Sequence, residues 1–464
     1  MSAWLVKPEK VDKVNTMLRS RDAAHKAGAA DFILGLKASD IPAAARHAAT
    51  RALYDTLGVA AAALATPNSG IVRAFAVEAC GPGKKSAAIL FDGRRVSLPG
   101  AVMASSGSID SLDAHDGLKP TKGHIGVVAV PALIAFAEGF GAPAGAEFMT
   151  RLVMAYEIAA RAGLALHATV ADYHTSGAWN ALAAAAIGAR AMGLGHEETR
   201  HALGIAEYNG PRSQMMRCID HPTMLKDGAT MGGFAGAAAA LLAAMGHTGA
   251  PAITVERGDA AHLWADLGQR WYVGEQYIKP YPVCRWAQPA VAAALSLKGR
   301  LAPADIASLA IHTFHEATRL PGAAPANTEE AQYSIRFPVA AALQRGRIGV
   351  DEVAGSGLGD ATIIALARRI ELVEEDRYNA TFPAQRQAHV EVVLTSGERL
   401  VSPTCDAIGD PETPFDDAVM REKFMVLAAP VLGEGRAARL LGDIEGLWQA
   451  KSSAPVIVAA TAAP

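Results

Sequence analysis

The feature that most restricts the fold of this chain is a succession of apolar segments, rich in alanine and glycine and separated by short polar breaks. They include residues 43–65, 126–138, 144–195 and 228–246. In residues 43–65, the apolar positions recur at the spacing of one helix face. Hydrophobic residues make up 51% of the sequence but aromatic residues only 6%, so the apolar side chains are mostly small. Small side chains let helices approach closely, and the sequence therefore predicts a mainly α protein.

Strand signals are concentrated in one part of the chain. Residues 308–314 and 389–395 alternate between apolar and polar side chains, and a Ser396-Gly397 turn separates the second run from a short run at 399–401. Helical patterns occupy 289–297 and 334–344 between them. This part of the sequence predicts a smaller α+β domain.

The order of these patterns predicts three segments. Residues 1–275 form a helical domain, residues 276–405 form the α+β domain, and residues 406–464 carry further helices that pack back on the helical domain. An alanine- and proline-rich tail at the end is expected to be disordered. Two smaller features are a break at Pro67–Gly70 and a β-hairpin over residues 86–99 that turns at Asp92-Gly93.

Charge and cysteine content exclude several classes of protein. A net charge of −3 and a pI near 6.5 provide no basic field for nucleic acid or an anionic membrane. The four cysteines have no CxxC spacing, which argues against a zinc site and suits a reducing cytoplasm. Residues 228–246 are uncharged, but their alanine and glycine content fits a soluble helix better than a membrane span. We expect a soluble, cytoplasmic protein.

One polar stretch precedes the apolar segment that starts near residue 126. Titratable groups held against an apolar surface from which water is excluded have shifted pKa values, which proton-transfer chemistry requires. A polar loop that caps a buried helix, with its aspartates as turn residues, would have the same pattern. The titratable residues of this stretch are Asp110, Asp113, His115, Asp116, Lys119, Lys122 and His124.

Four further polar breaks adjoin helices of small residues, at 173–177, 211–228, 278–286 and 328–334. A histidine or lysine at a helix end is often a capping or snorkelling side chain, so each has a structural alternative. Lys279 lies near the predicted domain boundary, where ligand clefts are common. The candidates from these breaks are His174, Arg212, Arg217, Lys226, Lys279, Tyr281 and Arg285.

The motifs that are missing from the sequence also constrain its chemistry. It has no phosphate-binding GxxxxGK[ST], dinucleotide-binding GxGxxG, GxSxG or HExxH motif. Asp113, His115 and Asp116 lack the spacing of a helical zinc site, so we expect no metal and no cofactor. Aspartate, histidine and lysine would then act as acids and bases. The nearby arginines and lysines suit an anionic substrate with two or more carboxylates.

In their order along the chain, these stretches resemble the MmgE/PrpD family, which includes 2-methylcitrate dehydratase, cis-aconitate decarboxylase and iminodisuccinate epimerase. The resemblance implies a large helical domain made from both chain ends, a smaller α+β lid, a homodimer, and a site in the cleft between the domains. The segments that carry it are 31–36, 40–42, 53–59, 110–126, 225–226, 278–284, 330–334, 409–414 and 422–424.

The resemblance assigns the catalytic positions of the family to Asp113, His124, His174, Lys226 and Lys279. It also shows three departures from the family pattern. An aspartate replaces a histidine at position 110, a histidine replaces an aspartate at 115, and a glutamine stands at 288 where many members have histidine. Residues 318–325 contain no tyrosine where the decarboxylase branch has one, which disfavours decarboxylation.

These observations lead to the hypothesis of a cofactor-free dehydratase that acts on a small hydroxy-di- or tricarboxylate such as 2-methylcitrate. His124 or His174 would be the base, with Asp113 orienting it, while Lys226 and Lys279 would hold carboxylate and enolate charge. Two alternatives remain open, a dicarboxylate epimerase or isomerase and an inactive polycarboxylate-binding protein. The predicted substrate-binding residues are His115, Arg212, Arg217, Tyr281 and Arg285.

Overall fold

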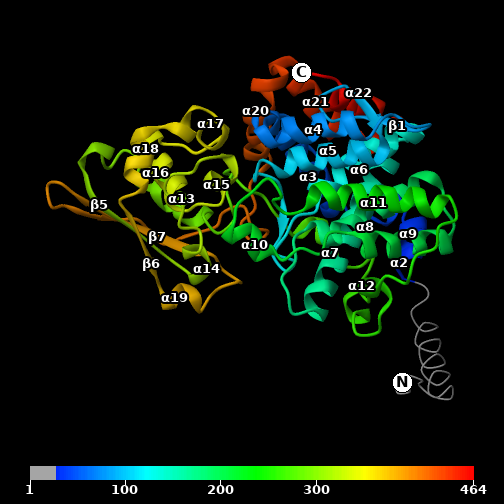
Figure 1. The fold of residues 1–464 in the computed structure, drawn as a ribbon, viewed down its shortest axis with the longest axis horizontal. Helices are drawn as coiled ribbons and strands as arrows, with labels where there is room; N and C mark the ends of the chain where they lie inside the picture. Colours follow the sequence, from blue (N-terminus) through cyan, green and yellow to red (C-terminus); the bar gives the residue numbers. More distant parts are fainter. Residues whose placement is uncertain (1–27) are drawn as a thin grey trace, which may run out of the picture.

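The computed structural model describes residues 28–464 (Figure 1), so the first 27 residues of the predicted helical domain lie outside the described part. Most of these residues are helical, which confirms the prediction of a mainly α protein. The helices before the sheet are α2 (Ala29–Gly35), α3 (Ala43–Ala62), α4 (Pro67–Ala79), α5 (Leu98–Asp110), α6 (Gly126–Phe140), α7 (Gly145–Thr169), α8 (Gly177–Met192), α9 (His196–Asn209), α10 (Met215–Asp220), α11 (Ala229–Ala244) and α12 (Ile253–Glu256).

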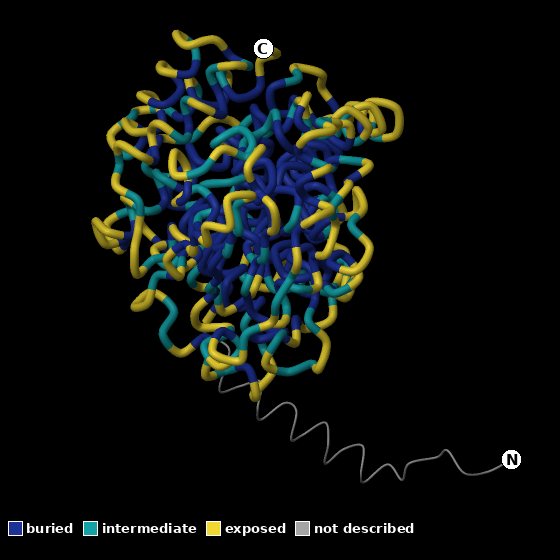
Figure 2. Tube along the Cα trace, turned by 90° about the vertical axis from the view of Figure 1, so that its left-hand side faces the viewer, coloured by how far each residue is buried: buried dark blue, intermediate teal, exposed yellow. Residues whose placement is uncertain are grey.

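Close helix packing at small residues explains the alanine and glycine content. Helix α11 packs against α5, α8 and α9. A Cβ on Gly236 of α11 would lie 2.1 Å from the carbonyl oxygen of Ala181 in α8, so only glycine fits there. The densely buried centre is the dark blue part of the trace in Figure 2. The apolar segments thus bury their surface against one another.

The helix predicted over residues 43–65 ends before Pro67, as predicted, but residues 67–70 are themselves helical because Pro67 begins helix α4. The Thr66 side chain accepts a hydrogen bond from the N–H of Ser69 and caps the helix, and proline is well tolerated in a first turn. The predicted hairpin is confirmed, since β1 (Ser86–Ala88) and β2 (Arg95–Ser97) pair antiparallel.

The predicted strands form a mixed sheet with the order β6-β5-β7-β8, and β9 also pairs with β7. Strand β5 is parallel to β6 and antiparallel to β7. Strand β6 was not predicted from the sequence. In Figure 1 the sheet and its helices lie on one side of the molecule, beside the α2–α12 helices. The strands are β5 (Ile306–Thr313), β6 (Ile370–Glu374), β7 (Gln387–Leu394), β8 (Arg399–Val401) and β9 (Cys405–Asp406).

Seven helices accompany these strands along the chain. Helix α13 packs against β7, and α16 packs against α13 and α18. The helices are α13 (Gln288–Ser296), α14 (His315–Thr318), α15 (Thr328–Gln332), α16 (Arg336–Arg345), α17 (Val350–Ala354), α18 (Ala361–Ala367) and α19 (Asp376–Asn379).

The last part of the chain returns to the first helices. Helix α20 (Asp417–Leu432) packs against α3, and α21 (Glu434–Glu445) packs against α20 and α3. The predicted disordered tail is wrong, because it contains helix α22 (Ala454–Thr461), which packs against α21 and α6. Its Ala460 carbonyl accepts a hydrogen bond of 2.8 Å from the N–H of Phe91. Burial of its small apolar residues holds this segment in place.

A short strand pair connects the stretch after α5 with the start of the predicted α+β segment. Strands β3 (Gly117–Leu118) and β4 (Gln276–Tyr277) are antiparallel. A Cβ on Gly117 would lie 2.3 Å from the Tyr277 ring, so the glycine allows this close contact. The pair brings the polar stretch beside the residues that follow β4. None of the helices in residues 28–464 is long and apolar enough to cross a membrane.

Candidate active site

The polar stretch between α5 and α6 is buried and is held by side chains of the surrounding helices. Lys423 of α20 donates to the carbonyl of Ala114 at 2.9 Å, and it pairs with Asp55 of α3 at 2.6 Å. The carboxylate of Asp116 accepts hydrogen bonds from the Tyr156 hydroxyl at 2.5 Å and from the backbone N–H of Gly126, the first residue of α6, at 3.2 Å. These contacts tie the stretch to α6, α7 and α20.

Asp113 forms a buried ion pair with Lys279. Lys279 Nζ lies 2.5 Å from Asp113 Oδ1, and the two side chains are 1% and 4% exposed. Burial opposes ionisation of Asp113, but the ammonium groups of Lys279 and Lys226 hold the pKa of this carboxyl well below its usual range. The pair joins the polar stretch to the residues after β4.

Gln332, the last residue of α15, connects Asp113 with Lys226. Its Oε1 accepts hydrogen bonds from the backbone N–H of Asp113 at 2.5 Å and from Lys226 Nζ at 3.3 Å. Lys226 Nζ also lies 4.5 Å from the centre of the Tyr333 ring. The backbone of Lys226 is left-handed, with φ +47°, which is uncommon for a residue with a side chain and often accompanies functional sites.

His124 lies between two acceptors. Its Nδ1 lies 2.5 Å from the carbonyl oxygen of Asp116, so Nδ1 carries the proton and donates it. Its Nε2 lies 3.2 Å from Asp227 Oδ2, and Asp227 also accepts from the Ser176 hydroxyl at 3.3 Å. Burial, together with the charge of Lys279, lowers the pKa of His124, which favours the neutral imidazole. A neutral Nε2 beside a carboxylate can accept a proton.

His115 is fully buried against His124. The two rings meet edge to face at 4.5 Å between centroids, and neither ring nitrogen of His115 has a hydrogen-bond partner within the described chain. Burial is the main reason that the pKa of His115 lies well below its usual value. Nearby, burial and the charge of Asp227 raise the pKa of Asp110 well above normal. Asp110 and His115, the two residues of this stretch that depart from the family pattern, therefore both favour their neutral forms.

Asp113, His124 and Lys279 line a small cavity of about 40 Å³, to which both the helical part and the sheet-bearing part contribute. This volume has room for only a few water molecules, whereas small-molecule sites usually have several hundred cubic ångströms. The charged residues and the histidine that line the cavity are Asp113, Lys122, His124, Lys279, Arg285 and Arg386.

Of the five predicted catalytic residues, Asp113, His124 and Lys279 line the cavity, and Lys226 adjoins it through Gln332 and Tyr333. His174 is not among the lining residues, and its Nδ1 lies 2.8 Å from the carbonyl oxygen of Asp172. The predicted contact between Asp113 and a histidine base also needs correction. The carboxylate beside His124 is Asp227, because Asp113 points to Lys279.

The predicted substrate-binding residues fall into two groups. His115 and Arg285 are buried at the site, but Arg285 already donates to the carbonyls of Ala407 and Ile408 and to Asp410. The other three do not line the cavity: Arg212 and Arg217 are exposed, and Tyr281 is partly buried.

Sequence reasoning missed two charged residues of this site. Asp227 follows Lys226 directly, so its position beside a candidate lysine was the available signal. Arg386 stands just before β7, and no motif marks it. Two buried tyrosines, Tyr277 and Tyr333, also line the cavity, and burial raises the pKa of both hydroxyls.

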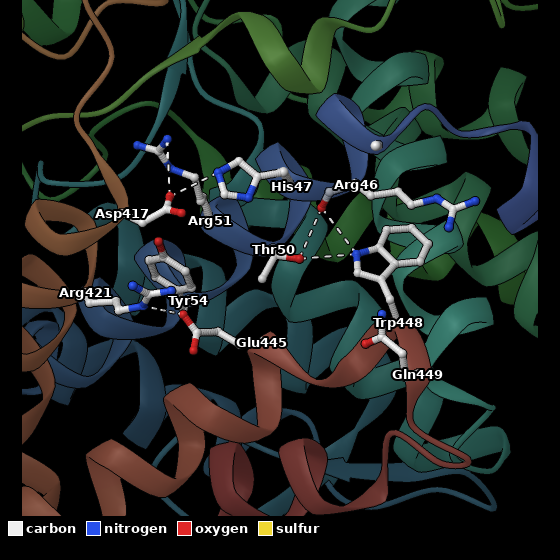
Figure 3. A pocket seen from close by; sticks show the side chains of 11 residues that line it. Arg46, His47, Thr50, Arg51, Tyr54, Asp417, Arg421, Glu445, Trp448 and Gln449 are labelled. Atoms are coloured by element: carbon white, nitrogen blue, oxygen red, sulfur yellow. Dashed lines mark hydrogen bonds and ion pairs between the residues drawn. The ribbon is translucent and has the colours of Figure 1, made fainter.

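A larger cavity of about 370 Å³ lies elsewhere, between α3, α20 and α21 (Figure 3). Most of its charged side chains are paired with one another, with Asp417 3.0 Å from His47 and Arg421 2.6 Å from Glu445, and Arg46 donates to the carbonyls of Ile41 and Ala38. Trp448 donates to Thr50 at 3.2 Å on the same wall. These mutual pairs leave little free charge for a ligand.

Within residues 28–464, one group of side chains is close enough to hold a metal ion, namely His312, Glu375 and His389 on the sheet. His312 Nδ1 lies 2.7 Å from Glu375 Oε1, and the guanidinium of Arg377 lies 3.2 Å from His389 Nδ1. A bound cation would meet the positive charge of Arg377. The group does not line the cavity of Asp113 and His124.

Two family models match the chain. Residues 28–263 match the MmgE/PrpD N-terminal domain, and residues 281–445 match the MmgE/PrpD C-terminal domain. Among the curated proteins compared, none matches the chain.

Proposed function

This chain belongs to the MmgE/PrpD family, and from that premise we propose that it is a cofactor-independent lyase. Family membership supports lyase or dehydratase chemistry in general. The proposed substrate is a small hydroxy-di- or tricarboxylate of the 2-methylcitrate kind. The observation that carries the proposal is a cavity lined by His124, whose pKa is lowered by burial, and by the Asp113–Lys279 ion pair.

His124 is the proposed base. Its Nδ1–H is held by the carbonyl of Asp116, which leaves Nε2 to take the proton next to a substrate carboxylate. The imidazolium that forms would be stabilised by Asp227, 3.2 Å away. A positioned base of this kind typically contributes about 10²–10⁴-fold to the rate.

Lys279 and Lys226 are proposed to stabilise the charge that develops on the substrate. Removal of an α-proton creates an enediolate-like charge, and preorganised cations in a dry site stabilise such charge strongly. The acid that protonates the departing hydroxyl is proposed to be Tyr333 or Tyr277, whose raised pKa values keep their hydroxyl groups protonated. The products would be an alkene and water.

We further propose that residues 276–405 act as a lid on the helical part, with residues 406–464 belonging to the helical part. The small volume of the cavity supports this division, because a substrate could enter only if the two parts separate. Lys279, Gln332 and Arg386 belong to the proposed lid. The ion pair and the Gln332 contacts would then form on closure.

A homodimer is also proposed. Ile71 and Phe75 of α4, together with Leu225 and Met231 near α11, are each more than half exposed. The two places are close, because the Asn68 side chain donates to the carbonyl of Met224 at 3.1 Å. Apolar surface of this kind is typical of protein interfaces. Phe75→Arg should convert a dimer to a monomer in size-exclusion chromatography with light scattering.

The lyase proposal can be tested with a panel of citrate-like and succinate-like acids followed by proton NMR and ultraviolet absorbance. We expect one hydroxy acid to lose water and give a conjugated double bond. His124→Ala should abolish this reaction while circular dichroism remains that of the folded protein. If no acid of the panel yields an alkene with the wild-type protein, the proposed lyase activity is wrong.

Epimerisation of a dicarboxylate is the second candidate, and the buried tyrosines favour it as a specific alternative. An epimerase needs a base on one face and a proton donor on the other, and His124 with Tyr333 or Tyr277 could supply both. In heavy water, an epimerase would place deuterium at the α-carbon without alkene formation. A dehydratase would give the alkene.

A further inference from the structure

Arg386 is a buried cation, and two of the three nitrogen atoms of its guanidinium group have no hydrogen-bond partner within the described chain. It stands just before β7, where its backbone carbonyl accepts a hydrogen bond of 3.0 Å from the N–H of Ala407. The residue is only 5% exposed, and its Nε and Nη1 have no hydrogen-bond partner within the described chain. Buried polar groups are nearly always hydrogen-bonded, so this side chain requires an explanation.

The other buried cations that line the cavity are neutralised by the protein. Lys279 pairs with Asp113, and Arg285 pairs with Asp410 and two backbone carbonyls. The guanidinium of Arg386 cannot lose its proton. Within residues 28–464 it forms no ion pair, and the face of the Phe382 ring at 6.0 Å is a weak substitute for a counter-ion. An anion in the cavity would supply it.

The position of Arg386 indicates which anion this would be. It lines the same cavity as His124 and Lys279, but it comes from the sheet, whereas His124 comes from the stretch before α6. A substrate that gives its proton to His124 and places one carboxylate at Lys279 would reach Arg386 with another group. The planar guanidinium binds a carboxylate through two parallel hydrogen bonds.

We infer that Arg386 binds a second carboxylate of the substrate and selects molecules with at least two carboxylates over monocarboxylates. This inference rests on the proposed function for the placement of the first carboxylate. It adds a specificity-determining residue that precedes β7 and lines the same cavity.

The test is isothermal titration of the full chain with propane-1,2,3-tricarboxylate and with butyrate. The tricarboxylate has no hydroxyl to eliminate, so binding is measured without turnover. Arg386→Gln should weaken tricarboxylate binding about 10- to 100-fold, as expected for loss of hydrogen bonds to a charged group. The affinity of Arg386→Lys for the tricarboxylate should lie between that of the wild type and that of Arg386→Gln. The affinity of either variant for butyrate should differ from wild type by less than about twofold. Arg399→Gln, which removes an exposed arginine from the same sheet, is the matched control and should bind like wild type.

The melting temperature of the ligand-free protein separates binding from a structural role. Because Arg386 Nε and Nη1 make no hydrogen bond to lose, and the Phe382 ring lies as far as 6.0 Å from the guanidinium carbon, Arg386→Gln should melt at or near the wild-type temperature. A large decrease would mean that the guanidinium supports the fold, and it would overturn the inference. Wild-type affinity of Arg386→Gln for the tricarboxylate, or no binding by the wild type, would overturn it too.

These outcomes are distinct from failure of the proposed function. A protein that binds the tricarboxylate through Arg386 but dehydrates no hydroxy acid would retain this inference and lose the lyase proposal. A protein that dehydrates a hydroxy acid and binds the tricarboxylate equally well with Arg386→Gln would retain only the lyase proposal.

Discussion

Lys279→Met breaks the buried ion pair with Asp113, and its cost in stability should depend on pH. The two atoms are 2.5 Å apart and almost without solvent, so methionine leaves the carboxylate without its nearest counter-ion. Loss of one partner from a buried pair typically costs about 3–5 kcal/mol. The carboxyl can instead take up a proton, and this alternative sets an upper limit on the cost of keeping it buried.

The limit follows from the ordinary pKa of 3.8 for an unfolded aspartate. At about 1.36 kcal/mol per pH unit, keeping the proton on Asp113 costs about 4.4 kcal/mol at pH 7 and about 1.6 kcal/mol at pH 5. In the wild type the pKa of Asp113 is lowered, so its stabilisation is fully present above the unfolded pKa and changes little between these pH values. In the variant the pKa would be raised, so stability would be lost as pH rises.

We therefore expect Lys279→Met to cost about 3–4 kcal/mol at pH 7 and less than about 2 kcal/mol at pH 5. Urea unfolding followed by circular dichroism and tryptophan fluorescence measures both values. Asp113→Asn combined with Lys279→Met should cost at least about 2 kcal/mol less than the sum of the single variants at pH 7. Lys84→Met, at an exposed lysine, is the control and should change stability by less than about 0.5 kcal/mol. Equal costs at both pH values, or additive single costs, would refute the reasoning.

Three further predictions concern the surroundings of His124. Asp227→Asn should lower kcat about 10- to 100-fold and shift the acidic limb of the kcat/KM profile to lower pH, because the imidazolium of His124 would lose the carboxylate of Asp227 as its partner. An unshifted limb would exclude this contact from catalysis. His124→Ala should abolish turnover in the NMR assay, whereas His174→Ala, away from the cavity lining, should retain most of it; the reverse result would make His174 the base. Burial raises the pKa of Asp116 to about 6, so the stability due to this group is present below its unfolded pKa of 3.8 and lost as pH rises through about 6. Relative to wild type, Asp116→Asn should therefore gain about 2.4 kcal/mol of stability between pH 4 and pH 7.5 in urea unfolding, and a pH-independent difference would contradict this.

Much of the helical architecture could be predicted from the sequence because small apolar residues at helical spacing have few other ways to bury their surface. The alternating runs that became β5 and β7 were predictable for a similar reason. Local patterns failed where tertiary contacts decide. The segment that forms α22 is rich in alanine and proline, and only its packing on α21 and α6 makes it a helix.

The site was predictable in its residue types more than in its contacts. The resemblance placed Asp113, His124 and Lys279 together, and these three line one cavity. Which carboxylate faces the histidine depends on side-chain directions that no sequence pattern encodes. Asp227 and Arg386 were missed because the function of a buried charged residue depends on its neighbours in three dimensions, which no local sequence pattern specifies.

The contact between α8 and α11 also links the proton affinity of His124 to the tightness of the helical core. Gly177 begins α8 and donates its N–H to the carbonyl of Asp227 at 2.9 Å, and a Cβ on Gly177 would lie 2.2 Å from the carbonyl oxygen of Gly228. The backbone of Asp227 is therefore held against the start of α8, and this position sets where its carboxylate meets the imidazole. Added methyl groups along this seam would change the optimum pH of the reaction without altering any residue that meets the substrate.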